Sequence, residues 1–232
     1  MRSLRVLAVI VTLLGLLVAP VGPAQASSPE HSNMQWQGGG AVAIYPLASG
    51  NGEWYVGFGT ISYTMNGETV QDQMSVAAGL FESSCTADGS RCSVYGVDGG
   101  AVVPPQTFTI DANLGAAHLS PIPLTAQGYA CTWGWDDQGQ SYSQCQDITV
   151  TTTVSASLFA TGAEEVTPYH EVSRSDGAGG YGYRSIISDV TLSRPATGTA
   201  SAFDVTDDSP SWGRIARQSS TNVSTYWPSF TA

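Results

Sequence analysis

The chain has 232 residues with 8 Arg, no Lys and 19 acidic residues, which gives a formal net charge of −11. This acidic balance excludes the basic surface with which proteins bind nucleic acid or anionic lipid. Charged residues make up only 12% of the chain and apolar residues 42%, so the sequence can build a core for one all-β domain whose surface is mostly Ser, Thr, Asn and Gln.

Residues 1–26 have the three parts of a secretory signal peptide. Two arginines form the positive n-region, Val6–Val18 is the apolar run, and Ala24-Gln25-Ala26 is a small-x-small cleavage site. The apolar run is too short to cross a hydrocarbon core of about 30 Å. No apolar segment long enough to span a membrane occurs later in the sequence. We therefore expect cleavage before Ser27 and secretion of an unanchored protein with 6 Arg against 19 acids.

The mature chain divides into three predicted parts. Residues 27–40 form a polar lead-in, residues 41–206 a single β domain, and residues 207–232 a polar tail rich in Ser, Thr and Pro that Trp212, Tyr226 and Trp227 are placed to anchor. Apolar and polar residues alternate at strand spacing through the domain, and helical spacing is nearly absent. The predicted strands are Ala41–Leu47, Trp54–Tyr63, Met74–Leu80, Ser93–Val97, Thr107–Asp111, Leu124–Thr132, Ile148–Leu158, Val166–Arg174, Gly182–Leu192 and Thr199–Val205.

Two of these strands carry additional information. In Trp54–Tyr63 the apolar phase changes around Gly59, which predicts a bulge or a strand that passes between two sheets. In Ile148–Leu158 the apolar residues alternate with Thr and Ser, which predicts one buried and one solvated face.

Turn signals separate the strands. The glycine-rich turn at 176–180 predicts a hairpin between the runs on either side of it. About ten short antiparallel strands predict a β-sandwich or a closed barrel.

Four cysteines in an exported chain predict two disulfides. Three pairings are formally possible. Sequence proximity favours Cys85–Cys92 and Cys131–Cys145, because each pair brackets a turn-rich stretch and would close a hairpin tip. The rival interpretation, a zinc site, is disfavoured because the spacings do not match zinc motifs and no His is near either pair.

The most suggestive candidate site lies in the second cysteine loop. Trp133 and Trp135 flank a glycine and would share one face of an extended chain, with Tyr129 and Tyr142 nearby. Exposed aromatic rings on a rigid β scaffold stack on sugar rings or apolar peptide segments. Packing of these indoles in the core is the alternative, although the following Asp136-Asp137-Gln138-Gly139 favours a surface tip.

Catalytic motifs are absent from the sequence. His118 and Ser175 lack the surrounding motifs of serine hydrolases, and a chain without Lys cannot form a lysine-bearing phosphate loop. The acidic pairs Glu164-Glu165 and Asp136-Asp137 keep a glycoside hydrolase with an unlocated carboxylate pair as an alternative. The acids Asp204, Asp207 and Asp208, and likewise Asp136, Asp137 and Asp147, match no calcium loop, so we expect neither a metal site nor a cofactor.

The C-terminal third resembles secreted β-rich proteins of high-GC Gram-positive bacteria. The resemblance is carried by the Thr-rich strand Asp147–Ala160, the Gly182-Tyr183-Arg184-Ser185 run and the segment Val190–Phe203, and the use of Arg without Lys fits such a genome. It implies a secreted β protein and no particular activity.

These observations predict a monomeric, extracellular module that binds a partner or has a structural role. The expected partners are a polysaccharide, a cell-wall polymer or an extracellular protein. A secreted carbohydrate-active hydrolase and a protein inhibitor that uses a disulfide-closed loop are the alternatives.

Overall fold

The structure, a computed structural model, describes residues 30–104, 106–136, 138–175 and 181–228. The predicted signal peptide and the glycine-rich turn at 176–180 lie outside this part of the chain. The described residues are 81% strand and contain no helix, which confirms the all-β prediction. Within them, no helix has the length and apolar character needed to cross a bilayer.

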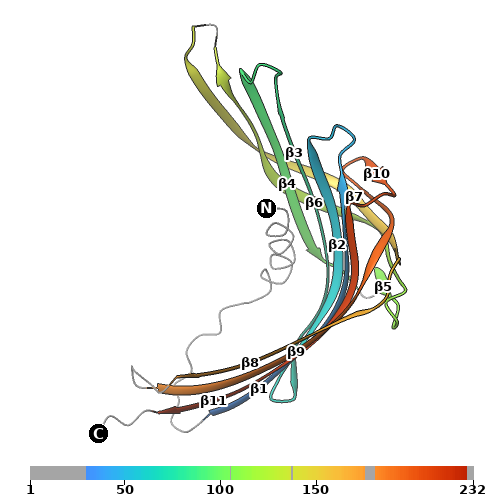
Figure 1. Cartoon of the computed structure of the whole chain (residues 1–232), viewed down its shortest axis with the longest axis vertical. Coiled ribbons are helices and arrows are strands. Elements are labelled where there is room, and N and C mark those ends of the chain that lie inside the picture. Colours follow the sequence, from blue (N-terminus) through green and yellow to red (C-terminus); the bar gives the residue numbers. More distant parts are fainter. Residues whose placement is uncertain (1–29, 105, 137, 176–180, 229–232) are drawn as a thin grey trace.

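In the part of the chain that the structure describes, eleven antiparallel strands form one sheet (Figure 1). They are β1 (Glu30–Pro46), β2 (Gly52–Met65), β3 (Glu68–Cys85), β4 (Arg91–Val102), β5 (Phe108–Ile110), β6 (Ala116–Trp135), β7 (Ser141–Ala160), β8 (Glu165–Ser175), β9 (Tyr181–Ala202), β10 (Val205–Asp207) and β11 (Trp212–Pro228). The predicted hairpin is confirmed, because β8 pairs with β9 from Glu165↔Ser193 to Ser175↔Tyr183.

The strand order is β10-β9-β11-β1-β2-β3-β4-β6-β5, and β7 pairs with both β6 and β9. The β7–β9 ladder covers only Ser155–Ala160 of β7. This ladder connects the two ends of the sheet around the core. The described strands that form the resulting closed circuit, each paired with the next, are β9, β11, β1, β2, β3, β4, β6 and β7. Beyond that ladder the long strands of the described residues continue as a single layer (Figure 1).

The core lies inside this circuit. Trp54, Val56 and Val154 are fully buried, and the Tyr45 and Trp54 rings stack with centroids 4.5 Å apart. Tyr45 also donates a hydrogen bond to the carbonyl of Gly198 at 2.9 Å, which satisfies its buried hydroxyl. The predicted two-faced strand Ile148–Leu158 is confirmed within β7, since its even-numbered residues from Thr152 to Leu158 are buried.

Two arms extend from the core and bend toward the same side of the molecule (Figure 1). The disulfide arm consists of the ends of β3, β4, β6 and β7 (80–85, 91–98, 127–135 and 141–149), and the tyrosine arm of the ends of β1, β2, β8, β9 and β11 (31–38, 61–65, 165–175, 182–191 and 218–226). We call the side of the sheet that carries the core residues the core face and the opposite side the outer face. Phe108 of β5 packs against Phe58 in the core, and β5 lies on the convex side of this crescent (Figure 1). The core face is therefore on the convex side, and the outer face of the arms is on the concave side.

Three glycines allow neighbouring strands to approach closely on the outer face. Gly38, Gly40 and Gly59 lie on the outer face, and a Cβ on any of them would come within 2.8–3.0 Å of a backbone oxygen on the neighbouring strand. A Cβ at these positions would force the neighbouring strand to move, so glycine allows the close approach of the strands here.

Three sequence predictions are wrong. The predicted tail 207–232 contains β11, which lies between β1 and β9, and most of the predicted lead-in 27–40 belongs to β1. Both segments are polar because they extend into an arm that has solvent on both faces.

No register shift occurs at Gly59, and the bulge in β2 lies at Tyr63/Thr64. The apolar phase changes because β2 leaves the core at Phe58 and then carries its large residues on the outer face.

Candidate functional site

Four exposed aromatic residues lie on the outer face of the disulfide arm. Phe81, Tyr129, Trp133 and Trp135 have 42%, 44%, 40% and 59% of their surface accessible to solvent. The alternation of β6 places its three rings on one side of the strand. Phe81 joins them because it and Tyr129 both pair with Gly96 of β4. The indoles are therefore surface residues and not part of the core.

Gly96 brings two of these rings together. A Cβ at Gly96 would lie 3.5 Å from atoms of both the Phe81 and Tyr129 rings, so both side chains border the space above this residue. The pair Gly96↔Tyr129 continues to Asp147 of β7, which lies directly opposite Tyr129. A carboxylate thus stands beside the aromatic rings on the same face.

Tyr142 does not belong to this group. It pairs with Gly134, the residue between the two tryptophans, and therefore lies on the core face of the arm. A Cβ on Gly134 would be 3.2 Å from the Tyr142 hydroxyl oxygen, so the ring occupies the space beside that glycine. The expectation that Tyr142 contributes to the same aromatic surface is wrong, because side chains on paired residues share a face and Gly134 faces away from Trp133 and Trp135.

Two disulfides brace this arm, and the predicted pairing is confirmed. Cys85–Cys92 joins β3 to β4 and Cys131–Cys145 joins β6 to β7, with Cα–Cα distances of 4.0 and 4.1 Å. The described residues include no free cysteine. All four cysteines lie on the outer face with the aromatic residues. Two disulfides indicate an oxidising, extracellular type of environment.

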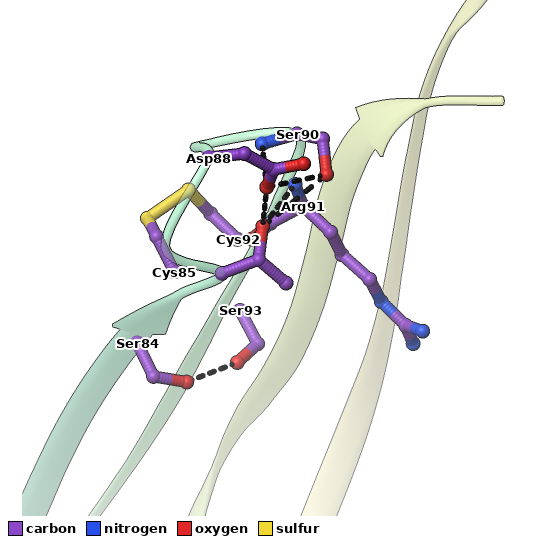
Figure 2. Close-up of a disulfide and its surroundings, with 8 residues drawn as sticks. Ser84, Cys85, Asp88, Ser90, Arg91, Cys92 and Ser93 are labelled. Atoms are coloured by element: carbon purple, nitrogen blue, oxygen red, sulfur yellow. Dashed lines mark hydrogen bonds between the residues drawn. A yellow bond between two sulfur atoms is a disulfide. The ribbon is translucent and has the colours of Figure 1, made fainter.

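The first hairpin tip is further ordered by side-chain hydrogen bonds (Figure 2). The Asp88 carboxylate accepts hydrogen bonds from the Thr86 hydroxyl at 2.6 Å, the Ser90 hydroxyl at 2.8 Å and the Ser90 amide at 3.0 Å. These bonds lower the pKa of Asp88 to about 2, with the Thr86 bond as the largest cause. A cavity of about 310 Å³ beside this disulfide is lined by Ser84, Cys85, Thr86, Arg91, Cys92 and Ser93, and contains none of the exposed aromatic rings.

A second aromatic group lies on the outer face of the tyrosine arm. Tyr169, Tyr183 and Tyr226 are 51%, 38% and 44% exposed, and the Tyr183 and Tyr226 rings have centroids 6.3 Å apart. A row of paired residues crosses five strands on this face, in the order Tyr169, Asp189, Ser220, Trp36 and Tyr63.

The sequence offered only a weak signal for Phe81 and for these tyrosines. Phe81 falls out of phase with the apolar residues Met74–Leu80, and an aromatic residue out of phase with a buried strand face is expected at the surface. The tyrosines lie in segments far apart along the chain, so only the register brings them together.

Two hydrogen bonds link phenols to carboxylates on the outer face. The Tyr55 hydroxyl donates to Asp98 at 2.5 Å, and the Tyr169 hydroxyl donates to Glu171. Burial, followed by the bond to Asp98, raises the pKa of Tyr55, and the bond to Glu171 raises the pKa of Tyr169. Both phenols remain protonated donors at neutral pH, which holds the carboxylates in place on the outer face.

The residues considered for catalysis or metal binding do not come together. The His118 and His170 rings contact Ser157 at 3.3 Å and Ser188 at 2.9 Å, and no carboxylate is hydrogen-bonded to either ring among the described contacts. Glu165 of the predicted acidic pair binds Arg214 at 2.6 Å. Of the second pair, Asp137 lies outside the described residues. No group of three or more His, Cys, Asp or Glu side chains that could hold a metal ion occurs in the described ranges.

No model of a known protein family matches the chain, and neither does any curated protein. The class defined by the fold is therefore an all-β, disulfide-stabilised protein with an aromatic outer face.

Proposed function

We propose that the protein is a secreted extracellular module that binds a polysaccharide, with the outer face of the disulfide arm as the binding surface. The observation that carries this proposal is the set of exposed rings Phe81, Tyr129, Trp133 and Trp135 on one face of a rigid arm. These rings leave 40–59% of their surface exposed on one face, and a group of exposed apolar side chains is typical of a binding surface.

Rigidity supports the proposal. Both disulfides lie within the four-stranded arm, so the rings are fixed before a ligand arrives. A preorganised surface loses less conformational entropy on binding, and planar rings match the apolar faces of sugar rings. The carboxylates beside the rings, such as Asp147, can accept hydrogen bonds from sugar hydroxyls.

The test is a pull-down of the mature protein with insoluble cellulose, chitin and a bacterial cell-wall preparation. Trp133→Ala and Trp135→Ala are compared with Tyr142→Ala, which removes an aromatic ring from the same arm on the opposite face. We expect the two tryptophan variants to weaken binding by roughly thirtyfold while their melting temperatures stay close to that of the wild type. The Tyr142 variant should bind as the wild type does. Tryptophan variants that fold normally and bind every polymer like the wild type would overturn the proposal.

A further inference from the structure

Among the described residues, charged side chains are distributed unequally between the two faces of the sheet. Acidic side chains on the outer face include Glu53, Asp98, Asp147, Glu165, Glu171 and Asp189, as the cross-strand pairs show. Arg214 shares this face, but it is bound to Glu165 and to the Ser193 hydroxyl at 2.6 and 2.7 Å. The outer face is therefore acidic over its whole length.

The core face of the two arms carries more arginines than acids, Glu82 being its one acid within the arm ranges given above. Arg91 pairs with Gly134 and so lies on the same face of the disulfide arm as Tyr142. On the tyrosine arm, Arg174 and Arg184 are direct cross-strand partners and Arg217 pairs with Leu192 on that same face. Most acids of the arms therefore lie with the exposed aromatic rings, and most arginines lie on the other face.

Acids and aromatic rings are also neighbours at the level of single residues. Asp147 lies opposite Tyr129, and Glu53 lies opposite Phe81. On the other arm, Asp189 lies opposite Tyr169, whose hydroxyl binds Glu171. An aromatic face with an adjacent carboxylate attracts a cationic group through both the ring quadrupole and the negative charge.

From this complementarity we infer that the outer face selects a cationic polysaccharide, one whose sugar rings carry free, protonated amino groups. The inference rests on the proposed function, since it names the class of polymer that the same surface would take. Sugar rings stack on the exposed aromatic side chains while their ammonium groups lie beside the carboxylates. A polymer with carboxylate or phosphate groups is repelled by the acids of this face and by the net negative charge of the protein.

The second aromatic group extends this surface. Tyr183 and Tyr226 lie on the outer face of the other arm, and both arms bend toward the same side (Figure 1). A long chain can therefore contact both arms, and two linked contacts raise the affinity above that of either one.

The experiment compares binding to chitin, to its deacetylated form chitosan, and to carboxymethylcellulose, at low salt and at a pH where the chitosan amines are protonated. We expect chitosan to bind most tightly, chitin more weakly and carboxymethylcellulose not at all, and we expect added salt to reduce the preference for chitosan. Glu53→Gln and Asp147→Asn should each weaken chitosan binding by roughly two- to fivefold, which is the effect expected for one exposed charge pair.

Glu82→Gln is the matched control. It removes one negative charge from the same arm, but Glu82 pairs with Tyr95 and lies on the core face. We expect this variant to bind chitosan like the wild type.

The outcomes separate the inference from the proposed function. If chitin and chitosan bind equally and the acidic variants have no effect, while Trp133→Ala and Trp135→Ala weaken binding, the charge selection is wrong and the aromatic surface stands. If the tryptophan variants bind chitosan like the wild type, the stacking surface is wrong, and the inference fails with it. Tight binding of carboxymethylcellulose would also overturn the inference.

Discussion

Trp133 lies directly opposite Cys92 in the β4–β6 ladder, so its indole stands in the same row as the Cys85–Cys92 disulfide. Cys131 lies two residues earlier on the same strand and face and is bonded to Cys145. An aromatic ring placed between two covalent crosslinks has little freedom to move with fraying strand ends. The disulfides therefore support the surface that the aromatic residues form.

Loss of the second disulfide should destabilise the disulfide arm. In the loop-entropy model, each of these short loops contributes roughly 2–3 kcal/mol to the free energy of unfolding. The double variant Cys131→Ser/Cys145→Ser should melt several degrees below the wild type in a thermal scan followed by circular dichroism. Peptide mapping of the wild-type protein provides the control, and a crosslink between Cys92 and Cys131 would contradict the arrangement of the arm.

Truncation of Trp54 should have a far larger effect on stability than truncation of Trp133. Trp54 is fully buried against Tyr45, and an alanine there leaves a cavity that costs about 3–5 kcal/mol. Chemical denaturation should show this loss for Trp54→Ala and a clearly smaller one for Trp133→Ala, since Trp133 is 40% exposed.

Trp54→Phe separates the cavity from the buried polar group. The Trp54 Nε1–H has no hydrogen-bond acceptor among the described residues, and phenylalanine removes it while keeping an aromatic ring. We expect Trp54→Phe to lose clearly less stability than Trp54→Ala, and equal losses would mean that the ring stack contributes nothing.

Gly128 should not tolerate a side chain. A Cβ at this position would lie 1.8 Å from the carbonyl oxygen of Gly96 on the neighbouring strand, so the β4–β6 ladder would have to move. Overpacking of this kind costs about 1–3 kcal/mol, and we expect Gly128→Ala to lower the melting temperature accordingly. Gly100→Ala is the control, because its Cβ would meet its nearest neighbour at an ordinary 3.5 Å. The interpretation is wrong if the two variants have the same stability.

The carboxyl group of Asp88 should titrate well below its ordinary range. Its pKa is lowered from 3.8 to about 2 by the bonds from Thr86 and Ser90, so these bonds stabilise the folded state fully above pH 3.8 and are lost as the pH falls through 2. An NMR titration of the side-chain carbon should give a midpoint near 2. Thr86→Val should move this midpoint upward, and an unchanged midpoint would show that the Thr86 bond is not the main cause.

Local patterns in the sequence determined much of the fold. The alternation in Ile148–Leu158 identified a strand with one buried face, because side chains on a strand alternate between its two sides. The turn-bracketing cysteines identified both disulfides, since short loops bring their ends together with little loss of entropy. The two-residue spacing of Trp133 and Trp135 likewise predicted that both indoles share one face of an extended chain.

Only the tertiary structure decided what surrounds these residues. Tyr142 lies on the opposite face because of its register with Gly134, and Phe81 joins the aromatic surface because of its register with Gly96. Residues 212–228 resemble a tail in composition, yet they form β11 between β1 and β9. Strand pairing is a non-local interaction, and a polar sequence is compatible with a strand wherever both faces of the sheet contact water. Neither the register nor the exposure of the arms can therefore be read from the local pattern of residues.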